Sequence, residues 1–182
     1  MQTLCVFCGS SAGNDPLYIE KARELGYSIA GAGLELVYGG GSIGLMGELA
    51  DAIIERGGRV TGVIPRFLYD RELGHEGVTE LIVVDSMHER KMKMAELTDG
   101  FLAMPGGIGT IEELFEVFTW LQLSLIRKPV ALFNLNRYFD SLLTFLDHMV
   151  AEGFLIEEMR NRLITGTDAE VILKSMQTNS TQ

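Results

Sequence analysis

The sequence contains only two cysteines and three histidines among its 182 residues. Cys5 and Cys8 form a single C-x-x-C with no second pair or histidine cluster beside it, so we expect reduced packing residues and no metal site. No apolar run reaches the roughly 18 residues that a membrane span needs. The N-terminal Met1-Gln2-Thr3 also lacks the positive charge of a signal peptide. We therefore expect a cytoplasmic protein that does not contact a membrane.

Positive charge is scarce as well. The chain carries 15 Lys and Arg against 25 Asp and Glu, a formal net charge of −10. This balance argues against non-specific nucleic-acid binding, which depends on neutralising many phosphates with basic side chains. A small anionic substrate is still compatible with it where cations gather locally. With 47% hydrophobic residues, a chain of this length fits one domain that buries about 70% of its unfolded surface.

Apolar segments alternate with amphipathic helical patterns along the whole chain. Strands are predicted at Thr3–Cys8, Leu34–Tyr38, Arg59–Ile64, Leu81–Val84, Gly100–Met104, Pro129–Phe133 and Leu163–Thr165. Helices are predicted at Pro16–Ala32, Leu45–Arg56, Met87–Leu97, Ile111–Leu125, Phe139–Glu152 and Asp168–Ser175. The alternation predicts an α/β fold, a Rossmann-like doubly wound parallel sheet in a three-layer α/β/α arrangement. Residues 1–176 are expected to form this single nucleotide-binding domain, and the polar residues 177–182 a disordered tail.

Glycine-rich turns follow three of the predicted strands. In Leu102–Glu113, an apolar strand runs into a turn with Gly106, Gly107 and Gly109 and then into a helix whose first turn carries two carboxylates. Glycines let backbone amides approach an anion, and the unpaired N–H groups of a helix start favour negative charge. Similar turns follow the first and second strands and include Ser10, Gly39, Gly40 and Gly41. Because the carboxyl ends of parallel strands share one edge, the turns predict a site for a phosphorylated ligand.

Glu113 has a second, purely structural interpretation. Thr110 followed three residues later by Glu113 fits a capping box, in which a side chain and the backbone satisfy each other at a helix start. Both interpretations remain open for Glu113 at this point.

The turn Gly39–Gly44 also fits the dinucleotide fingerprint G-x-G-x-x-G. That fingerprint needs an acidic residue about 20 positions later to hold a ribose hydroxyl. The segment Gly57–Tyr69 contains no Asp or Glu, and the next predicted strand is followed by Arg66. The turn also follows the second strand, whereas the fingerprint normally follows the first. These departures argue against a dehydrogenase, although Arg66 would suit a phosphorylated cofactor.

A cluster of cations opens the helix predicted at Met87–Leu97. Ser86 with Glu89 is a plausible capping box, and Glu89 with Lys93 has favourable i, i+4 spacing. Arg90 and Lys91, however, lie in the first turns of the helix, where the macrodipole disfavours cations. We interpret these two residues as candidates for anion binding, with a solvated charged face as the alternative.

The helix predicted at Ile111–Leu125 is apolar around most of its circumference, and one sheet cannot cover all of it. We therefore expect a homodimer that buries the remaining surface. The alternative is a helix enclosed within its own fold. The apolar positions are Leu114, Phe115, Val117, Phe118, Trp120, Leu121, Leu123 and Leu125.

The segment Met87–Lys91 followed by Pro105–Glu113 resembles the Lonely Guy family, whose signature is P-G-G-x-G-T-x-x-E. Members of that family are cytokinin riboside monophosphate phosphoribohydrolases and are often mislabelled as lysine decarboxylases. Ile108 stands where plant members often carry Tyr. The resemblance covers nearly the whole chain and includes Phe7–Ser11, Gly39–Gly47, Thr119–Leu123 and Lys128-Pro129-Val130.

The resemblance implies hydrolysis of the N-glycosidic bond of an adenine-type nucleoside 5′-monophosphate, giving free base and ribose 5-phosphate without a cofactor. It implies that Arg90 and Glu113 are the catalytic pair of a homodimer whose site lies near the interface. Glu113 would stabilise an oxocarbenium-like ribose or activate water, while Arg90 would clamp an anionic group or orient Glu113. The implied substrate contacts are Glu72, Lys91, Gly106, Gly107, Ile108, Gly109, Thr110, Ile111, Glu112 and Thr119.

Two other functions remain to be compared with this one. Rossmann-like proteins with similar loops include carriers of phosphorylated cofactors such as molybdopterin, which bind their ligand without consuming it. Lysine decarboxylation would require a lysine that forms a Schiff base with pyridoxal phosphate, together with its supporting groups. The sequence shows no such constellation.

Overall fold

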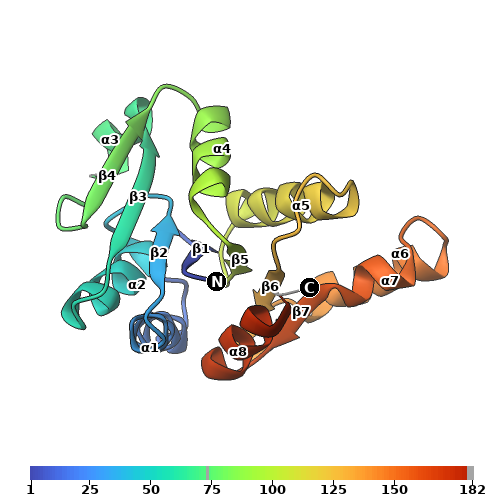
Figure 1. The fold of residues 1–182 in the computed structure, drawn as a ribbon. Helices are drawn as coiled ribbons and strands as arrows, with labels where there is room; N and C mark the ends of the chain where they lie inside the picture. Colours follow the sequence, from blue (N-terminus) through green and yellow to red (C-terminus); the bar gives the residue numbers. More distant parts are fainter. Residues whose placement is uncertain (73, 180–182) are drawn as a thin grey trace.

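Seven parallel strands form one sheet in the order β4-β3-β2-β1-β5-β6-β7, with helices on both faces (Figure 1). The coordinates are a computed structural model that describes residues 1–72 and 74–179. The strands are β1 Thr3–Phe7, β2 Glu35–Tyr38, β3 Val60–Pro65, β4 Glu80–Val84, β5 Gly100–Ala103, β6 Val130–Phe133 and β7 Leu163–Gly166. This architecture confirms the Rossmann-like fold predicted from the alternation of buried strands and amphipathic helices.

The helices divide between the two faces of the sheet. The apolar sides of α1, α2 and α8 pack on one face, and those of α4, α5, α6 and α7 on the other. The helices are α1 Leu17–Gly31, α2 Gly44–Glu55, α3 Arg66–Glu72, α4 Met87–Leu97, α5 Ile108–Gln122, α6 Asp140–Ala151, α7 Glu157–Asn161 and α8 Ala169–Asn179, with a 3-10 turn at Leu135–Arg137. Two of them, α3 and α7, are short helices that the sequence analysis did not predict.

The strand order reverses at β1, which pairs with β2 on one side and with β5 on the other. In open α/β sheets such a reversal opens a crevice outside the carboxyl ends of the strands, where ligands bind. The loops that follow β1 and β5 meet there, because the Gly9 N–H donates to the Pro105 carbonyl oxygen at 3.1 Å. The fold thus brings two of the three glycine-rich turns together.

Helix α5 begins three residues earlier than the sequence pattern predicted. Gly107 is its N-cap in an extended conformation, no side chain caps it, and Thr110 lies inside the helix. The capping box between Thr110 and Glu113 is therefore wrong, and so is the placement of two carboxylates in the first turn. Glu113 lies in the second turn, so capping cannot explain its presence.

Two further local predictions are corrected. The C-terminal residues 177–179 continue α8, where a disordered tail was expected over 177–182; residues 180–182 lie outside the described residues. At the start of α4 the Ser86 cap is confirmed, with the Glu89 N–H donating to the Ser86 hydroxyl at 3.1 Å. Lys93, however, lies 3.6 Å from Glu96, not in the predicted pair with Glu89.

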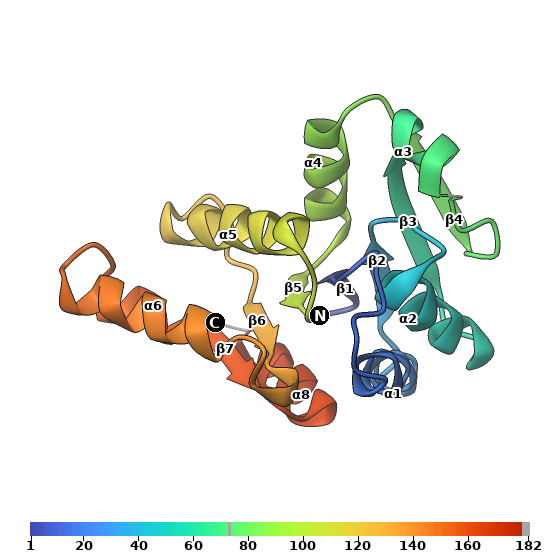
Figure 2. The same ribbon diagram turned by 180° about the vertical axis from the view of Figure 1, so that it is seen from behind.

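One side of α5 packs into the core, and the other side is only partly covered. Leu114 and Phe118 are buried, whereas Phe115 and Trp120 are half-buried. Just past the end of the helix, Leu125 is 68% exposed. In both views α5 and α6 run outward from the sheet on the same side of the molecule (Figure 2). Among the described helices, none is both long and apolar enough to cross a membrane.

Candidate active site

A cavity of about 300 Å³ lies at the reversal of strand order, where the loops after β1, β2 and β5 converge with α4. Two charged side chains face it, Arg90 from α4 and Glu113 from α5. The other lining residues are Val6, Phe7, Cys8, Gly9, Ser10, Gly39, Met46, Met94, Gly107, Ile108, Gly109 and Thr110. The structure therefore brings the predicted catalytic pair, Ser10, Gly39 and most of the predicted loop on α5 into one hollow.

Arg90 is buried because backbone carbonyls take the place of water around its guanidinium group. Its Nε donates to the Val63 carbonyl oxygen at 3.1 Å, and its Nη2 donates to the Gly39 carbonyl oxygen at 3.0 Å. A Cβ atom on Gly39 would lie 1.9 Å from that Nη2. Gly39 is therefore required for the close approach of Arg90, a role that the sequence pattern did not reveal.

The next two glycines of the same turn, Gly40 and Gly41, contact a different part of the chain. Gly40 has a φ of +76°, and its carbonyl oxygen accepts a hydrogen bond from the His75 N–H at 3.0 Å. Gly41 forms an isolated antiparallel bridge with Gly74. The structure does not bring Gly40 and Gly41 to the cavity, so their predicted contact with a phosphate has no geometric support.

Glu113 lies beside Arg90 in the lining of the cavity. Its Oε1 is 4.0 Å from Arg90 Nη1, and both side chains are about nine-tenths buried. Burial raises the pKa of Glu113 from its ordinary value of 4.5 to about 7, the Arg90 charge opposes this rise, and the Glu112 charge adds to it. Near neutral pH the carboxyl can therefore gain or lose a proton at little cost.

The N-terminus of α5 forms one wall of the cavity. The first hydrogen bond of the helix runs from the Ile111 N–H to the Gly107 carbonyl oxygen at 3.2 Å, which leaves the N–H groups of Ile108, Gly109 and Thr110 without an intrahelical acceptor. These three residues line the cavity. Free amides at a helix start are a ready site for a phosphate or carboxylate.

Lys91 ties α4 to α5 next to the cavity. Its Nζ lies 2.7 Å from Glu112 Oε1 and 3.1 Å from Glu116 Oε1. Burial alone would lower the pKa of Lys91, but its hydrogen bonds to the two carboxylates outweigh that effect and raise it. Glu116 was missed by the sequence analysis, although it lies one helical turn after Glu112 and so faces the same way.

Five more predicted contact residues do not line the cavity, namely Lys91, Gly106, Ile111, Glu112 and Thr119, and Gly106 lines a separate hollow of about 260 Å³. Thr119 is exposed on α5, about 14 Å along the helix axis from Thr110, and its hydroxyl donates to the Phe115 carbonyl oxygen at 2.7 Å. Ile111 packs against the core on the α5 side of the sheet. Glu72 ends α3, but its side chain lies outside what the structure describes.

Cys8 is a lining residue that the sequence analysis treated only as packing. Burial raises the pKa of its thiol, the Glu113 charge raises it further, and the Arg90 charge opposes the rise. The thiol is therefore protonated at neutral pH and a poor nucleophile. Both Cys8 and Cys5 are free cysteines.

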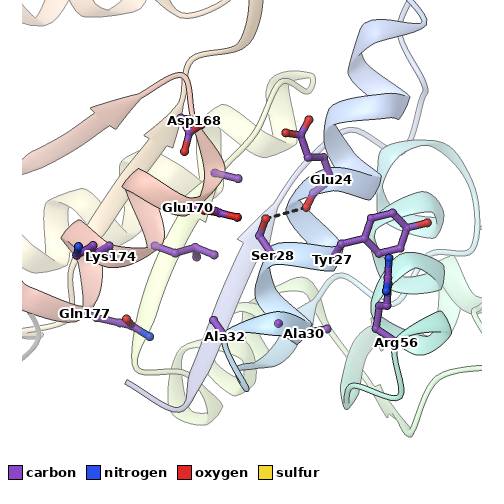
Figure 3. A pocket seen from close by; sticks show the side chains of 13 residues that line it. Glu24, Tyr27, Ser28, Ala30, Ala32, Arg56, Asp168, Glu170, Lys174 and Gln177 are labelled. Carbon is purple, nitrogen blue, oxygen red and sulfur yellow. Dashed lines mark hydrogen bonds between the residues drawn. The ribbon is translucent and has the colours of Figure 1, made fainter.

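A larger hollow of about 1080 Å³ runs between α1 and α8. Glu24 and Tyr27 from α1 and Lys174 from α8 lie along it (Figure 3). Neither Arg90 nor any of the glycine-rich turns lines this groove. Within the described part of the chain, no group of three or more His, Cys, Asp or Glu residues could hold a metal ion. The cavity beside Arg90 is therefore the candidate active site.

Comparison with known proteins gives close relatives over nearly the whole chain. A family model described as "Possible lysine decarboxylase" matches residues 46–176. The chain is 47% identical over 174 residues to cytokinin riboside 5′-monophosphate phosphoribohydrolase LOG1 of Arabidopsis thaliana, covering 96% of this chain and 82% of that protein. It is 48% identical over 172 residues to the LOG protein of the same description from Oryza sativa subsp. japonica, covering 94% and 71%.

Solved structures with the same fold are more distant in sequence. The molybdenum cofactor carrier protein MCP from Chlamydomonas reinhardtii has a TM-score of 0.74 at 21% identity, covering 100% of this chain and 99% of its own. The molybdenum cofactor binding protein from Rippkaea orientalis has a TM-score of 0.73 at 20% identity, covering 97% and 96%. These matches support the fold and carry no information about function.

Proposed function

Because this chain belongs to the Lonely Guy family of cytokinin riboside 5′-monophosphate phosphoribohydrolases, we propose that the cavity between Arg90 and the N-terminus of α5 is its catalytic site. The protein is a phosphoribohydrolase. In its reaction water adds to C1′ of the ribose, the bond from C1′ to the base breaks, and free base and ribose 5-phosphate are released. The observation that carries the proposal is a buried Arg–Glu pair beside unpaired helix amides.

The substrate's phosphate binds at the start of α5. Ile108, Gly109 and Thr110 line the cavity, and their N–H groups have no intrahelical acceptor, while the helix dipole adds partial positive charge there. Glu113 lies one turn further along the same helix. A nucleotide held by its phosphate would therefore place its ribose near the carboxyl group of Glu113.

Glu113 acts on the sugar as the glycosidic bond breaks. Cleavage develops positive charge on the ribose ring, and a nearby carboxylate stabilises that charge or takes a proton from the attacking water. Burial works against ionisation of Glu113, and Arg90 is the largest influence that lowers its pKa. Arg90 is itself fixed by the carbonyls of Val63 and Gly39. Its role is therefore to keep Glu113 ionised and in place, since a guanidinium is a poor proton donor.

Glu112 and Lys91 complete the site at its rim. The Glu112 side chain is 51% exposed and pairs with Lys91, so it is free to turn toward ribose hydroxyls at small cost. Lys91, once released from that pair, would supply positive charge near the phosphate. We assign both residues to substrate binding.

Lysine decarboxylation, the activity named by the matching family model, does not fit the lysine beside the cavity. A lysine that forms a Schiff base needs a depressed pKa, so that its amine is neutral and nucleophilic. The pKa of Lys91 is instead raised by two carboxylates. The ion pairs thus hold Lys91 in the unreactive, protonated form.

A second copy of the chain would cover the exposed apolar residues that follow α5 and α6. Leu123 and Leu125, just after α5, and Phe154 and Ile156, just after α6, are each more than 60% exposed, and both helices run outward on the same side of the molecule (Figure 2). Thr119 lies on α5 away from its own cavity. In a homodimer built on this surface, Thr119 would contact the nucleotide bound by the other subunit.

A product assay tests the proposed function against a carrier that only binds its ligand. The protein is incubated with AMP and with isopentenyladenosine monophosphate, and released base is measured by chromatography. Base should appear from a monophosphate and far more slowly from the unphosphorylated nucleoside. Glu113→Gln should lose activity by about 100-fold or more, while Glu96→Gln, an exposed carboxylate on α4, should not. If the protein binds the monophosphates but releases no base from them, it is better described as a carrier than as a hydrolase.

A further inference from the structure

We propose that Tyr138 is a positioning residue of the phosphate site, because its hydroxyl fixes the peptide group that carries the Gly107 N–H, the amide just before the three free amides of α5. The Tyr138 Oη donates to the Gly106 carbonyl oxygen at 2.5 Å. This inference rests on the proposed function, since it concerns how the loop before α5 binds the substrate's phosphate. Neither the glycine pattern nor the family signature points to this residue.

The loop before α5 is fastened from both neighbouring strands. On the β1 side, the Gly9 N–H donates to the Pro105 carbonyl oxygen at 3.1 Å. On the β6 side, the Tyr138 hydroxyl donates a hydrogen bond to the next carbonyl oxygen, that of Gly106. Two successive carbonyl oxygens are thereby held by donors of the protein itself. Neither is then free to face a bound anion, which a carbonyl oxygen would repel.

Because the peptide bond is planar, the hydrogen bond from Tyr138 to the Gly106 carbonyl oxygen also fixes the direction of the next N–H group, that of Gly107. In a trans peptide the carbonyl and the following N–H point in opposite directions. Because the Gly106 carbonyl points at Tyr138, the Gly107 N–H points away from it. Gly107 lines both the catalytic cavity and a second, adjoining hollow of about 260 Å³, whereas Tyr138 lines only the second one, so an N–H that points away from Tyr138 points toward the catalytic cavity. Tyr138 therefore stabilises the peptide orientation that an anion-binding loop requires.

The segment that carries Tyr138 is held in an unusual backbone conformation. The two preceding residues, Asn136 and Arg137, have φ values of +45° and +59°, in the left-handed region that side chains other than glycine rarely occupy. Asn134 locks this turn, since its side chain accepts from the Phe139 N–H at 2.8 Å and donates to Asp140 Oδ1 at 2.8 Å. A turn fixed in this way gives the Tyr138 hydroxyl one position relative to the loop.

The ring and the hydroxyl of Tyr138 can be separated experimentally. The ring packs edge-on against Tyr18, with centroids 6.0 Å apart, and against Phe139, with centroids 5.0 Å apart. Tyr138→Phe keeps both ring contacts and removes only the hydrogen bond to Gly106. Tyr18→Phe is a matched control, because it removes a hydroxyl from the same aromatic pair without touching the loop.

The experiment measures binding of ribose 5-phosphate by calorimetry, and KM and kcat for AMP, in the wild type and both variants. Losing one hydrogen bond should weaken ribose 5-phosphate binding about 3- to 10-fold in Tyr138→Phe. KM should rise by a similar factor with kcat nearly unchanged, because the phosphate is held equally in the ground and transition states. The melting temperature should stay within about 3 °C of the wild type, and Tyr18→Phe should match the wild type throughout.

Several results would contradict the role proposed for Tyr138. Unchanged ribose 5-phosphate binding in Tyr138→Phe, an equal loss in Tyr18→Phe, or no binding by the wild type would overturn the role of Tyr138. A fall in kcat with KM unchanged would also overturn it, because it would place the effect on the chemical step. The proposed function fails separately, when the wild type releases no base from any monophosphate. In that case, the calorimetric measurement of ribose 5-phosphate binding by the wild type and Tyr138→Phe still tests the role of Tyr138.

Discussion

Replacing Glu113 by Gln should stabilise the fold at alkaline pH while it lowers activity about 100-fold or more. The wild-type carboxyl is about nine-tenths buried, and burial raises its pKa to about 7. A carboxyl whose pKa is higher in the folded than in the unfolded state binds its proton more tightly when folded. Its contribution to stability is therefore complete below pH 4.5 and is lost as the pH rises through 7. Gln is uncharged at every pH and removes this dependence.

The size of the effect follows from the two pKa values. A shift from 4.5 to about 7 corresponds to about 3 kcal/mol between the protonated and ionised forms. The free energy of unfolding of Glu113→Gln, relative to the wild type, should therefore increase by about 3 kcal/mol between pH 4.5 and pH 8.5. For a domain of this size that corresponds to roughly 6–12 °C in melting temperature.

The assay is urea unfolding of both proteins, followed by circular dichroism at several pH values from 4.5 to 8.5. Comparing the change across pH cancels any constant effect of the amide and every other titrating group that the two proteins share. Glu96→Gln serves as the control, since its side chain is 61% exposed and its difference from the wild type should hardly vary with pH. If the difference in free energy of unfolding between Glu113→Gln and the wild type stays constant from pH 4.5 to 8.5, the argument that burial raises the pKa of Glu113 is refuted.

Three more expectations follow from the same site and surface. The rate of base release at saturating AMP should rise with pH through about 7, since the proposed mechanism uses the carboxylate form of Glu113; a rate that falls across this range would assign Glu113 to proton donation instead. Gly39→Ala should lower kcat/KM for AMP at least about 100-fold, because the new Cβ would displace the Arg90 guanidinium, whereas Gly31→Ala, with open space around its Cβ, should keep full activity. Leu125→Glu should shift the protein toward monomer in analytical ultracentrifugation, and Val171→Glu, on an equally exposed residue of α8, should not; an unchanged mass for both would exclude this surface as the dimer interface.

The sheet and its main helices were predictable because buried strands and amphipathic helices leave strong periodic signals. No strand end differs from the prediction by more than one residue. The start of α5 was misplaced because its N-cap is Gly107, which has no side chain to give a capping signal, and because Gly109 in the first turn is a poor helix former. The helices α3 and α7 were missed because five to seven residues are too few to show a 3.6-residue period.

The site was only partly predictable, because a glycine in a turn can make room either for a bound ligand or for another side chain of the protein. A glycine-rich turn after a strand suggests room for a phosphate, and this fits the turn before α5. At Gly39 the missing side chain instead makes room for Arg90, which comes 51 residues later in the chain. The choice between a ligand and the protein's own side chain depends on where α4 crosses the sheet. No local pattern around Gly39 encodes that.

The position of Arg90 explains why a cation is accepted at the start of a helix. The macrodipole disfavours it there by a few tenths of a kcal/mol, but hydrogen bonds to two carbonyl oxygens and the nearby Glu113 carboxylate offset that cost. Among the described residues no donor hydrogen-bonds Glu113, and at 4.0 Å its oxygen is too far from Arg90 for such a bond. The carboxylate is therefore stabilised by charge alone, and its oxygens stay available to the cavity. A pair optimised for stability would close this gap, whereas the proposed action of Glu113 on a sugar requires the gap to stay open.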